Sequence, residues 1–206
     1  MKISFWIDFK CPYSYIGYTR LNNTLNELKL NNTKYDIHAF ETKTNKNLQN
    51  KEEIELITKL AREEQLEFNP ENLKTTKTNK AHRLIKLAIQ NNNQEMIKNT
   101  IQNLFESAFI DEEDLNDDKI LLKIGIQSGL NPEEIQQLLS SDTFKDEVTL
   151  DKRVADDTNI MAVPYFILNN KYPLPGILPK KELKNVIKKV KFEEDIMIEY
   201  EKTQKK

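Results

Sequence analysis

The chain of 206 residues carries 31 basic and 33 acidic side chains, which gives a formal net charge of −2. This balance argues against nucleic acid as the main partner, because phosphate recognition needs a basic face. The length suits one domain, or one fold with an inserted subdomain, and is enough to bury a hydrophobic core without stabilising cross-links. The single cysteine excludes an intramolecular disulfide, a multi-cysteine zinc site and an iron–sulfur cluster held by one chain.

The first forty residues predict a strand, a helix and a second strand. Residues 2–9 are rich in β-branched and aromatic side chains, which favours a strand. Apolar residues then recur at helical spacing through residues 15–28. Residues 34–40 alternate between apolar and polar side chains, which indicates a strand with His38 on its solvated side. This order favours a βαβ unit with a right-handed crossover.

The opening residues also bear on location. Residues 3–9 are too short and too alternating for the core of a signal peptide. No stretch of the sequence approaches the ~18 consecutive apolar residues of a membrane span. We therefore expect a cytoplasmic protein with no membrane partner, in which a lone thiol stays reduced.

Residues 45–150 have the pattern of a helical block without a convincing strand. Apolar side chains recur at helical spacing in six segments, which are residues 52–66, 79–89, 96–109, 117–125, 131–139 and 144–157. His82 and Arg83 flank the apolar face of the second segment, and we favour a structural or interdomain role for them over proton transfer. Two distant histidines without supporting acids predict no metal site.

Strand signals return after the helical block. Residues 163–168 predict a strand, residues 169–170 a turn with positive φ, and residues 171–174 a return strand. Pro173 cannot donate to a ladder, which places the return strand at an edge. Pro179 begins a last helix, and its charged continuation is expected to be a surface helix or a frayed end. Neither pair of strands is stable alone, so all are expected to share one sheet.

Cys11 stands directly between the first strand and the first helix, and Pro12 suits the first helical position. Free N–H groups and the macrodipole at a helix amino terminus favour an anion. We therefore expect the pKa of the Cys11 thiol to lie below that of free cysteine and the sulfur to be nucleophilic near neutral pH. Ser14, one turn further on, can reach toward the sulfur or cap a backbone N–H. The alternative for Cys11 is an inert buried thiol.

Four motifs, in order along nearly the whole chain, resemble the DsbA-like thioredoxin-fold oxidoreductases, and the FrnE-like subgroup most closely. The first is Asp8-Phe9-Lys10-Cys11-Pro12-Tyr13-Ser14-Tyr15-Ile16-Gly17, which resembles the active-site stretch of that family. The others are an Ala-His-Arg helix motif in residues 79–84, a helical segment in residues 104–130, and a cis-proline loop in residues 162–166 followed by Gly176 and Pro179.

This resemblance implies an α/β protein with a thioredoxin fold, β-α-β … β-β-α, interrupted by an all-helical insertion. The thioredoxin-like domain would comprise residues 1–44 and 151–206, and the insertion residues 45–150. The resemblance also implies a cis peptide between Val163 and Pro164 that faces the active sulfur.

Cys11 and Ser14 are thus the candidate catalytic residues, and the resemblance makes Pro12, Tyr13, Val163 and Pro164 the candidate substrate-binding residues. The family usually carries a second cysteine where this chain has Ser14. Cys11 can then form a mixed disulfide but cannot resolve it within the chain. The related kappa-class glutathione transferases and 2-hydroxychromene-2-carboxylate isomerases carry Ser-Pro-Tyr-Ser here, so their catalytic serine matches Cys11 and their second serine matches Ser14.

The sequence therefore predicts a cytoplasmic thiol–disulfide oxidoreductase or isomerase with a monothiol mechanism. Its partners would be protein disulfides or glutathionylated thiols, with no bound cofactor and with glutathione as a candidate co-substrate. One alternative is a glutathione-dependent transferase or isomerase that acts on a small electrophile. Another is a non-catalytic adaptor that keeps the fold.

Overall fold

The computed structural model describes residues 1–30, 33–42, 50–73 and 76–204. Its elements in chain order are β1 (Lys2–Ile7), α1 (Pro12–Glu27), β2 (Lys34–Ala39), α2 (Lys51–Glu63), the 3-10 helix η1 (Pro70–Asn72), α3 (Asn79–Gln90), α4 (Gln94–Phe109), α5 (Asp118–Gln127), α6 (Pro132–Leu139), α7 (Lys145–Asp157), β3 (Tyr165–Leu168), β4 (Tyr172–Pro175) and α8 (Lys180–Gln204).

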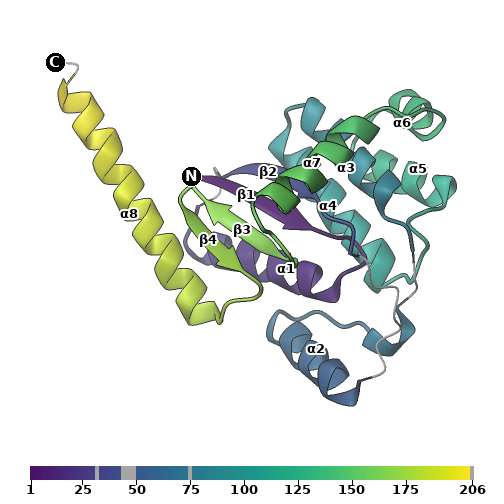
Figure 1. Cartoon of the computed structure of the whole chain (residues 1–206), viewed down its shortest axis with the longest axis horizontal. Coiled ribbons are helices and arrows are strands. Elements are labelled where there is room, and N and C mark those ends of the chain that lie inside the picture. The colour runs from purple at the N-terminus through teal and green to yellow at the C-terminus, as the bar shows by residue number, and fades with distance from the viewer. Residues whose placement is uncertain (31–32, 43–49, 74–75, 205–206) are drawn as a thin grey trace.

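The strands of the described residues form one mixed sheet in the order β2-β1-β3-β4 (Figure 1). β1 and β2 run parallel, with Ile7 opposite Ala39, so α1 is the crossover of a βαβ unit. β3 is antiparallel to β1, with Phe5 opposite Phe166, and β4 is antiparallel to β3. The predicted shared sheet and the edge position of the strand that contains Pro173 are confirmed.

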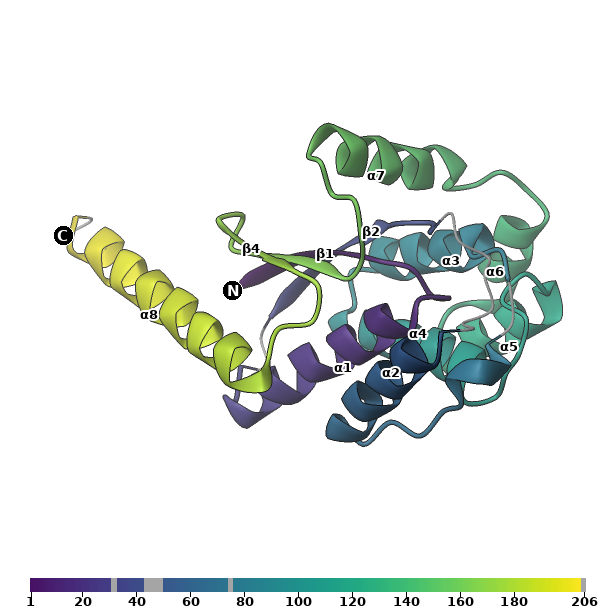
Figure 2. The same cartoon turned by 60° about the horizontal axis from the view of Figure 1, so that its bottom comes forward.

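The two faces of the sheet are covered by different helices, with α7 on one side and α1 on the other (Figure 2). Successive side chains of β1 point to opposite faces of the sheet and therefore enter different apolar clusters. Ile3, Phe5 and Ile7 belong to the main core, while Trp6 belongs to a second, smaller cluster with Ala155 of α7. One strand therefore supports two separate apolar clusters.

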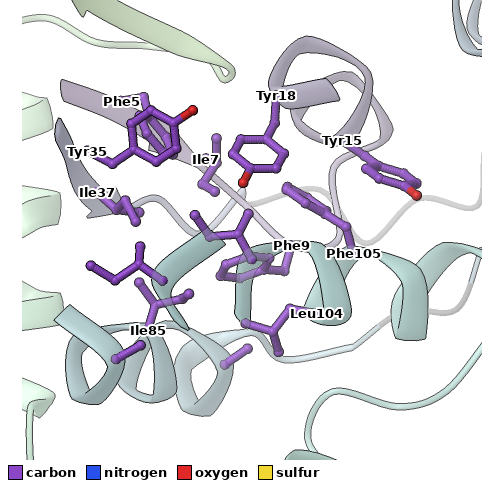
Figure 3. Close-up of a cluster of buried hydrophobic side chains, with 14 of the residues drawn as sticks. Phe5, Ile7, Phe9, Tyr15, Tyr18, Tyr35, Ile37, Ile85, Leu104 and Phe105 are labelled. Carbon is purple, nitrogen blue, oxygen red and sulfur yellow. The ribbon is translucent and has the colours of Figure 1, made fainter. Parts of the chain in front are cut away.

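The main core continues from the sheet into the helical insertion. Figure 3 shows aromatic rings from the β1–α1 region meeting Phe105 of α4. The ring centroids of Phe9 and Tyr15 each lie 5.0 Å from that of Phe105. The thioredoxin fold is thus interrupted by helices that share its core, and the proposed bounds of residues 45–150 for the insertion stay a prediction.

The helices begin where the sequence pattern indicates. Four of them start at side chains that accept hydrogen bonds from N–H groups of the first turn, namely Asn50, Asn93, Asp117 and Asn131. α8 continues as one helix to Gln204, which confirms the surface-helix alternative for the charged end. The sequence pattern did not predict η1. Within the described residues, no helix combines the length and apolarity that a membrane crossing requires.

Candidate functional site

The turn between β1 and α1 presents Cys11 at the amino end of α1. The Cys11 backbone is extended, with φ −97° and ψ 114°, and its N–H donates to the Asp8 carbonyl at 3.0 Å. The Cys11 carbonyl accepts from the N–H groups of Ser14 at 3.0 Å and Tyr15 at 3.2 Å. Pro12 occupies the start of the helix, where no N–H is needed. The Cys11 side chain makes no capping hydrogen bond, so its sulfur is left for other contacts.

The loop before β3 approaches Cys11 from the opposite side. The Val163–Pro164 peptide bond is cis, and the Cys11 Sγ lies 3.7 Å from the Val163 carbonyl oxygen, to which the thiol donates. The pairing of β3 with β1 brings together these residues, which are 152 positions apart in sequence. Gly17 leaves room for the loop, because a Cβ there would stand 2.6 Å from Pro164 Cγ. The two predicted site segments therefore meet at the sulfur.

Ser14 is fully buried beneath this turn. Its Oγ accepts from the Asp8 N–H at 3.3 Å, and Ser14 also hydrogen-bonds toward the Cys11 sulfur, which favours the thiolate. Ser14 thus tightens the turn and contacts the predicted nucleophile. Its catalytic role stays a prediction.

Pro12 and Tyr13, the candidate substrate-binding residues of α1, adjoin the sulfur. Pro12 is buried, and Tyr13 is half-buried against a cluster formed with Ile57 of α2. Burial, and then the nearby charge of Glu53, raise the pKa of the Tyr13 phenol. The structure brings these two residues and the Val163–Pro164 loop to one place, and their contact with a substrate stays a prediction.

A buried carboxylate lies directly behind the site. The Asp8 Oδ2 accepts from the Thr42 N–H and hydroxyl, both at 2.7 Å, and Oδ1 accepts from the Thr78 hydroxyl at 2.7 Å. His82 Nε2 stands 3.9 Å from Asp8 Oδ1, too far for a hydrogen bond. Burial acts to raise the pKa of Asp8, but His82 and the hydrogen bonds from Thr78 and Thr42 together hold it below its usual range. We call these four residues the Asp8 cluster.

The expectation of a low pKa for Cys11 is wrong in this arrangement. Cys11 is half-buried and packs against a cluster that we call the apolar wall, made of Trp6, Ala155, Ile160 and Val163. Burial, followed by the negative charge of Asp8, raises the pKa of the Cys11 thiol to about 11, although hydrogen bonds from Ser14 and the Tyr13 backbone act in the opposite direction. The expectation considered only the helix end, whereas desolvation and a nearby carboxylate prevail.

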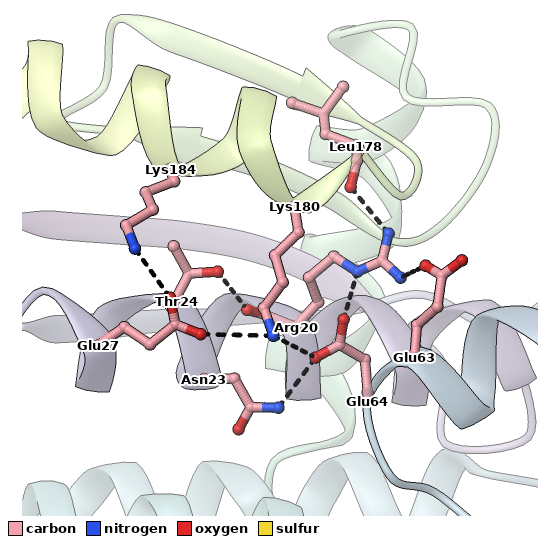
Figure 4. Close-up of polar contacts among 9 residues, drawn as sticks. All are labelled: Arg20, Asn23, Thr24, Glu27, Glu63, Glu64, Leu178, Lys180 and Lys184. Carbon is pink, nitrogen blue, oxygen red and sulfur yellow. Dashed lines mark hydrogen bonds and ion pairs between the residues drawn. The ribbon is translucent and has the colours of Figure 1, made fainter.

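A buried ionic cluster anchors α2 beside α1 (Figure 4). Arg20 Nε lies 2.6 Å from Glu64 Oε1, and its Nη2 lies 2.7 Å from Glu63 Oε2. The same guanidinium donates to the Leu178 carbonyl at 3.0 Å. We call Arg20, Glu63 and Glu64 the Arg20 cluster. Its contacts join α1 to the end of α2 and to the segment before α8. They thereby fix the helix against which Tyr13 packs.

His38, predicted to be solvated, is mostly buried instead. Its ring stacks on Trp6 with 4.2 Å between centroids, and its Nδ1 lies 2.9 Å from Asp151 Oδ1. Its Nε2 lies 3.5 Å from Asp36 Oδ1. The alternation of β2 identified the polar face correctly but could not show that α7 covers this face.

His82 and Arg83 are both buried, with 1% and 5% of their surface exposed. Arg83 donates to three backbone carbonyls, those of Leu138, Ser141 and Thr143. This confirms its structural role within the insertion. His82 packs on Phe9 with 5.0 Å between ring centroids, and among the described residues its Nε2 has no hydrogen-bond partner.

Comparison with known proteins agrees with this architecture. The model of the DSBA-like thioredoxin domain matches residues 2–191. The chain belongs to this family. A search of curated proteins found no match.

Solved structures share the fold at low sequence identity. A probable DsbA oxidoreductase from Streptomyces coelicolor superposes with a TM-score of 0.77 and 21% identity, covering 92% of this chain and 89% of that chain. A 2-hydroxychromene-2-carboxylate isomerase gives a TM-score of 0.70 and 11% identity, covering 99% of each chain. The cytosolic disulfide reductase DsbM from Pseudomonas aeruginosa gives a TM-score of 0.66 and 10% identity, covering 96% of this chain and 98% of that chain.

Several residues that shape the site of this DsbA-like domain were not predicted. Asp8 and Gly17 lie within the recognised motif. The motif does not show that the Asp8 charge acts on the Cys11 sulfur or that Gly17 packs against Pro164. Thr42, Thr78 and Asp151 are distant from Cys11 in sequence, and neither threonine carries a local signal. A polar residue on a helix face that is otherwise apolar, such as Asp151 beside Val148 and Ala155, was the available clue.

Proposed function

We propose that this DsbA-like domain is a thiol–disulfide oxidoreductase that works with a single cysteine. The observation that carries the proposal is the placement of Cys11 Sγ at the amino end of α1, 3.7 Å from the Val163 carbonyl on a cis-proline loop. The sequence holds no second cysteine, so resolution must come from outside the chain.

The reaction divides into two exchanges. The Cys11 thiolate attacks one sulfur of a glutathionylated protein, a Cys11–glutathione disulfide forms, and the protein thiolate leaves. A second glutathione thiolate then attacks the glutathione sulfur of this mixed disulfide and releases Cys11 as thiolate and glutathione disulfide. One glutathione thiol is oxidised for each protein thiol restored, and one disulfide is formed for each one broken, so the electrons balance. A protein disulfide would enter by the same attack and need one further exchange.

A reducing compartment suits this route. A thiol without a resolving partner depends on a supply of external thiol, which the cytoplasm maintains as glutathione. Support comes from the fold neighbours, since DsbM is described as a cytosolic disulfide reductase and a solved structure of it is described as containing glutathione. These points support our proposal of a cytoplasmic location, with protein disulfides or glutathionylated thiols as partners.

The raised pKa of Cys11 gives the proposal a kinetic signature. With a pKa of about 11 in the substrate-free arrangement, the neutral thiol predominates at pH 7. The thiolate fraction then rises about tenfold for each pH unit until that pKa is approached. The rate of the first exchange should follow this rise.

The decisive experiment uses intact mass spectrometry. The protein is incubated with glutathione disulfide, and a single glutathione adduct is expected on the wild type and none on Cys11→Ser. Addition of reduced glutathione should restore the original mass. Failure to form the adduct, or an adduct that glutathione cannot release, contradicts the proposal.

A matched variant tests the monothiol step itself. Ser14→Cys places a second thiol next to Cys11, and the adduct should then give way to an internal disulfide with loss of glutathione. If the variant instead accumulates the adduct as the wild type does, the two positions are not arranged for exchange.

A second candidate is glutathione-dependent transfer or isomerisation. The full-length superposition on a 2-hydroxychromene-2-carboxylate isomerase favours it. Against it, the position of the catalytic serine of those enzymes is occupied here by Cys11, and the hydroxyl of the fully buried Ser14 already hydrogen-bonds toward the Cys11 sulfur. Calorimetric titration of Cys11→Ser with reduced glutathione separates the candidates, because the transferase needs non-covalent binding of glutathione. A Cys11→Ala variant without any cellular phenotype would favour the adaptor hypothesis.

A further inference from the structure

Asp151 of α7 is a buried carboxylate that reaches the edge of the sheet. Its Oδ2 accepts from the Ala39 N–H at 2.7 Å, and this N–H faces away from β1 on an edge strand. Its Oδ1 lies 2.9 Å from His38 Nδ1, and Lys86 Nζ of α3 lies 2.5 Å from Oδ2. The carboxylate therefore takes the place of a missing neighbouring strand. We call Asp151, His38 and Lys86 the Asp151 cluster.

The helix held by this cluster carries one side of the thiol site. Ala155 lies one turn after Asp151, and the chain continues through Ile160 to Val163. These three residues complete the apolar wall with Trp6, and the wall is what packs against Cys11. His38 contacts the same wall directly, because its ring stacks on Trp6. The cluster is thus connected to the sulfur by two short chains of contacts.

We propose that Asp151 and His38 are positioning residues that set the reactivity of Cys11 by holding α7 and the apolar wall over the sulfur. The functional meaning of this inference rests on the proposed role of Cys11 as the nucleophile. With α7 docked, the wall keeps the thiol desolvated and protonated. When the cluster is broken, the wall loosens, water reaches the sulfur and the thiolate becomes accessible near neutral pH.

The cluster also makes this control depend on pH. His38 faces Asp151 on α7 and Asp36 on its own strand, while Lys86 from α3 pairs with Asp151 and Lys2 from β1 pairs with Asp36. Burial acts to lower the pKa of His38, but the two carboxylates prevail and raise it above its usual value near 6.5. A raised histidine pKa means that the docking contribution is complete below that usual value and is lost as pH rises through the raised one. As the pH rises above the pKa of His38, the apolar wall should therefore loosen and the Cys11 thiol should become accessible to water.

The test measures the rate of Cys11 alkylation by iodoacetamide against pH, read by intact mass. In Asp151→Asn the pKa of Cys11 should fall by about one unit or more from the wild-type value, and alkylation at pH 7.5 should accelerate about tenfold. The matched control is Asp156→Asn, which removes the same charge from an exposed position of the same helix and should leave the profile unchanged. An unchanged Cys11 pKa in a folded Asp151→Asn protein would overturn the inference.

A second variant keeps the inference testable if Asp151→Asn does not fold. His38→Gln retains a hydrogen-bond donor but cannot titrate. In a plot of the logarithm of the alkylation rate against pH, the wild type should show a slope greater than 1 over the range in which His38 deprotonates. The variant should keep the slope of 1 that loss of the thiol proton alone gives. A wild-type profile with the same slope as the variant contradicts the pH-dependent docking.

Iodoacetamide needs no disulfide chemistry, so this assay is independent of the proposed function. If the wild type never forms a glutathione adduct but Asp151→Asn still shifts the alkylation profile, the oxidoreductase proposal fails and the positioning role stands. If the adduct forms and the profile does not shift, the positioning role fails alone.

Discussion

Two buried carboxylates, Asp8 before the amino end of α1 and Glu64 against Arg20 of α1, are compensated in different ways. In the Arg20 cluster, Glu64 has a fully buried side chain and meets a guanidinium at 2.6 Å, and its second oxygen accepts from Asn23 at 2.9 Å. In the Asp8 cluster, Asp8 is equally buried, but its short contacts are neutral donors, and the His82 ring nitrogen stands 3.9 Å away.

The two kinds of compensation predict different roles for the two carboxylates. A carboxylate whose charge is cancelled by an adjacent cation projects little field beyond the pair, so the Arg20 cluster acts as a joint between helices. A carboxylate held by hydroxyl and amide dipoles keeps its charge, and Asp8 is near enough to raise the pKa of Cys11. Mutations in the first cluster should therefore change stability, and mutations in the second should also change the thiol.

The largest expected effect is that of Arg20→Met. The substitution removes the guanidinium from the buried Glu64 carboxylate and leaves it the more distant Lys180 Nζ at 3.9 Å, which should cost about 3–5 kcal/mol of unfolding free energy. Denaturant unfolding followed by circular dichroism measures this loss. In the fraction that remains folded, the pH profile of Cys11 alkylation should match the wild type, because the Arg20 cluster does not face the sulfur. A shifted profile would place the Arg20 cluster among the determinants of reactivity.

Gly17→Ala tests the packing around Cys11 without changing any charge. The new Cβ would meet Pro164 Cγ at 2.6 Å, and a proline ring cannot rotate away, so we expect a loss of about 1–3 kcal/mol and a displaced loop. Displacement removes the contact between Val163 and the sulfur, and alkylation should accelerate. Gly125→Ala is the control, because its nearest atom is the flexible tip of Ile135 at 2.5 Å, far from the site in the fold. Equal effects of both variants on alkylation would argue against a specific role for the loop.

Asp8→Asn tests the charge of the second cluster. One oxygen that accepts hydrogen bonds becomes an amide donor, which should cost about 1–3 kcal/mol. Removal of the negative charge should lower the pKa of Cys11 and raise its alkylation rate several-fold at fixed pH. A variant that loses stability but keeps the wild-type alkylation profile would show that Asp8 acts only as a structural residue.

The same carboxylate predicts an acid limit to stability. The pKa of Asp8 is held below its ordinary value of 3.8, so its stabilising contribution is present above that value and is lost as the pH falls through the lowered one. Unfolding midpoints measured below pH 4 should therefore fall with pH in the wild type, and fall less steeply in Asp8→Asn.

Local patterns predicted the elements well, whereas the surroundings of the thiol required the fold. The strand and helix on either side of Cys11 follow from β-branched residues, Pro12 and helical periodicity, and the family motifs identified Pro164 as its partner. The pKa of Cys11 could not be predicted, because the apolar wall and the Asp8 carboxylate reach the sulfur through contacts that span the chain. His38 was misjudged for the same reason, since a strand's alternation does not reveal a helix packed on its polar face.

The smallest expected effect is that of Lys184→Met, at the exposed margin of the Arg20 cluster. Lys184 pairs with Glu27 at 3.0 Å, and this pair is open to water. Solvent screening and side-chain entropy offset most of an exposed ion pair, so the melting temperature should not change measurably, and added salt should affect both proteins alike. Arg20→Met removes a cation from the same network (Figure 4) with the same replacement, which makes the two variants a matched pair. A comparable loss in both would mean that the number of ion pairs, rather than their burial, determines how much this network stabilises the fold.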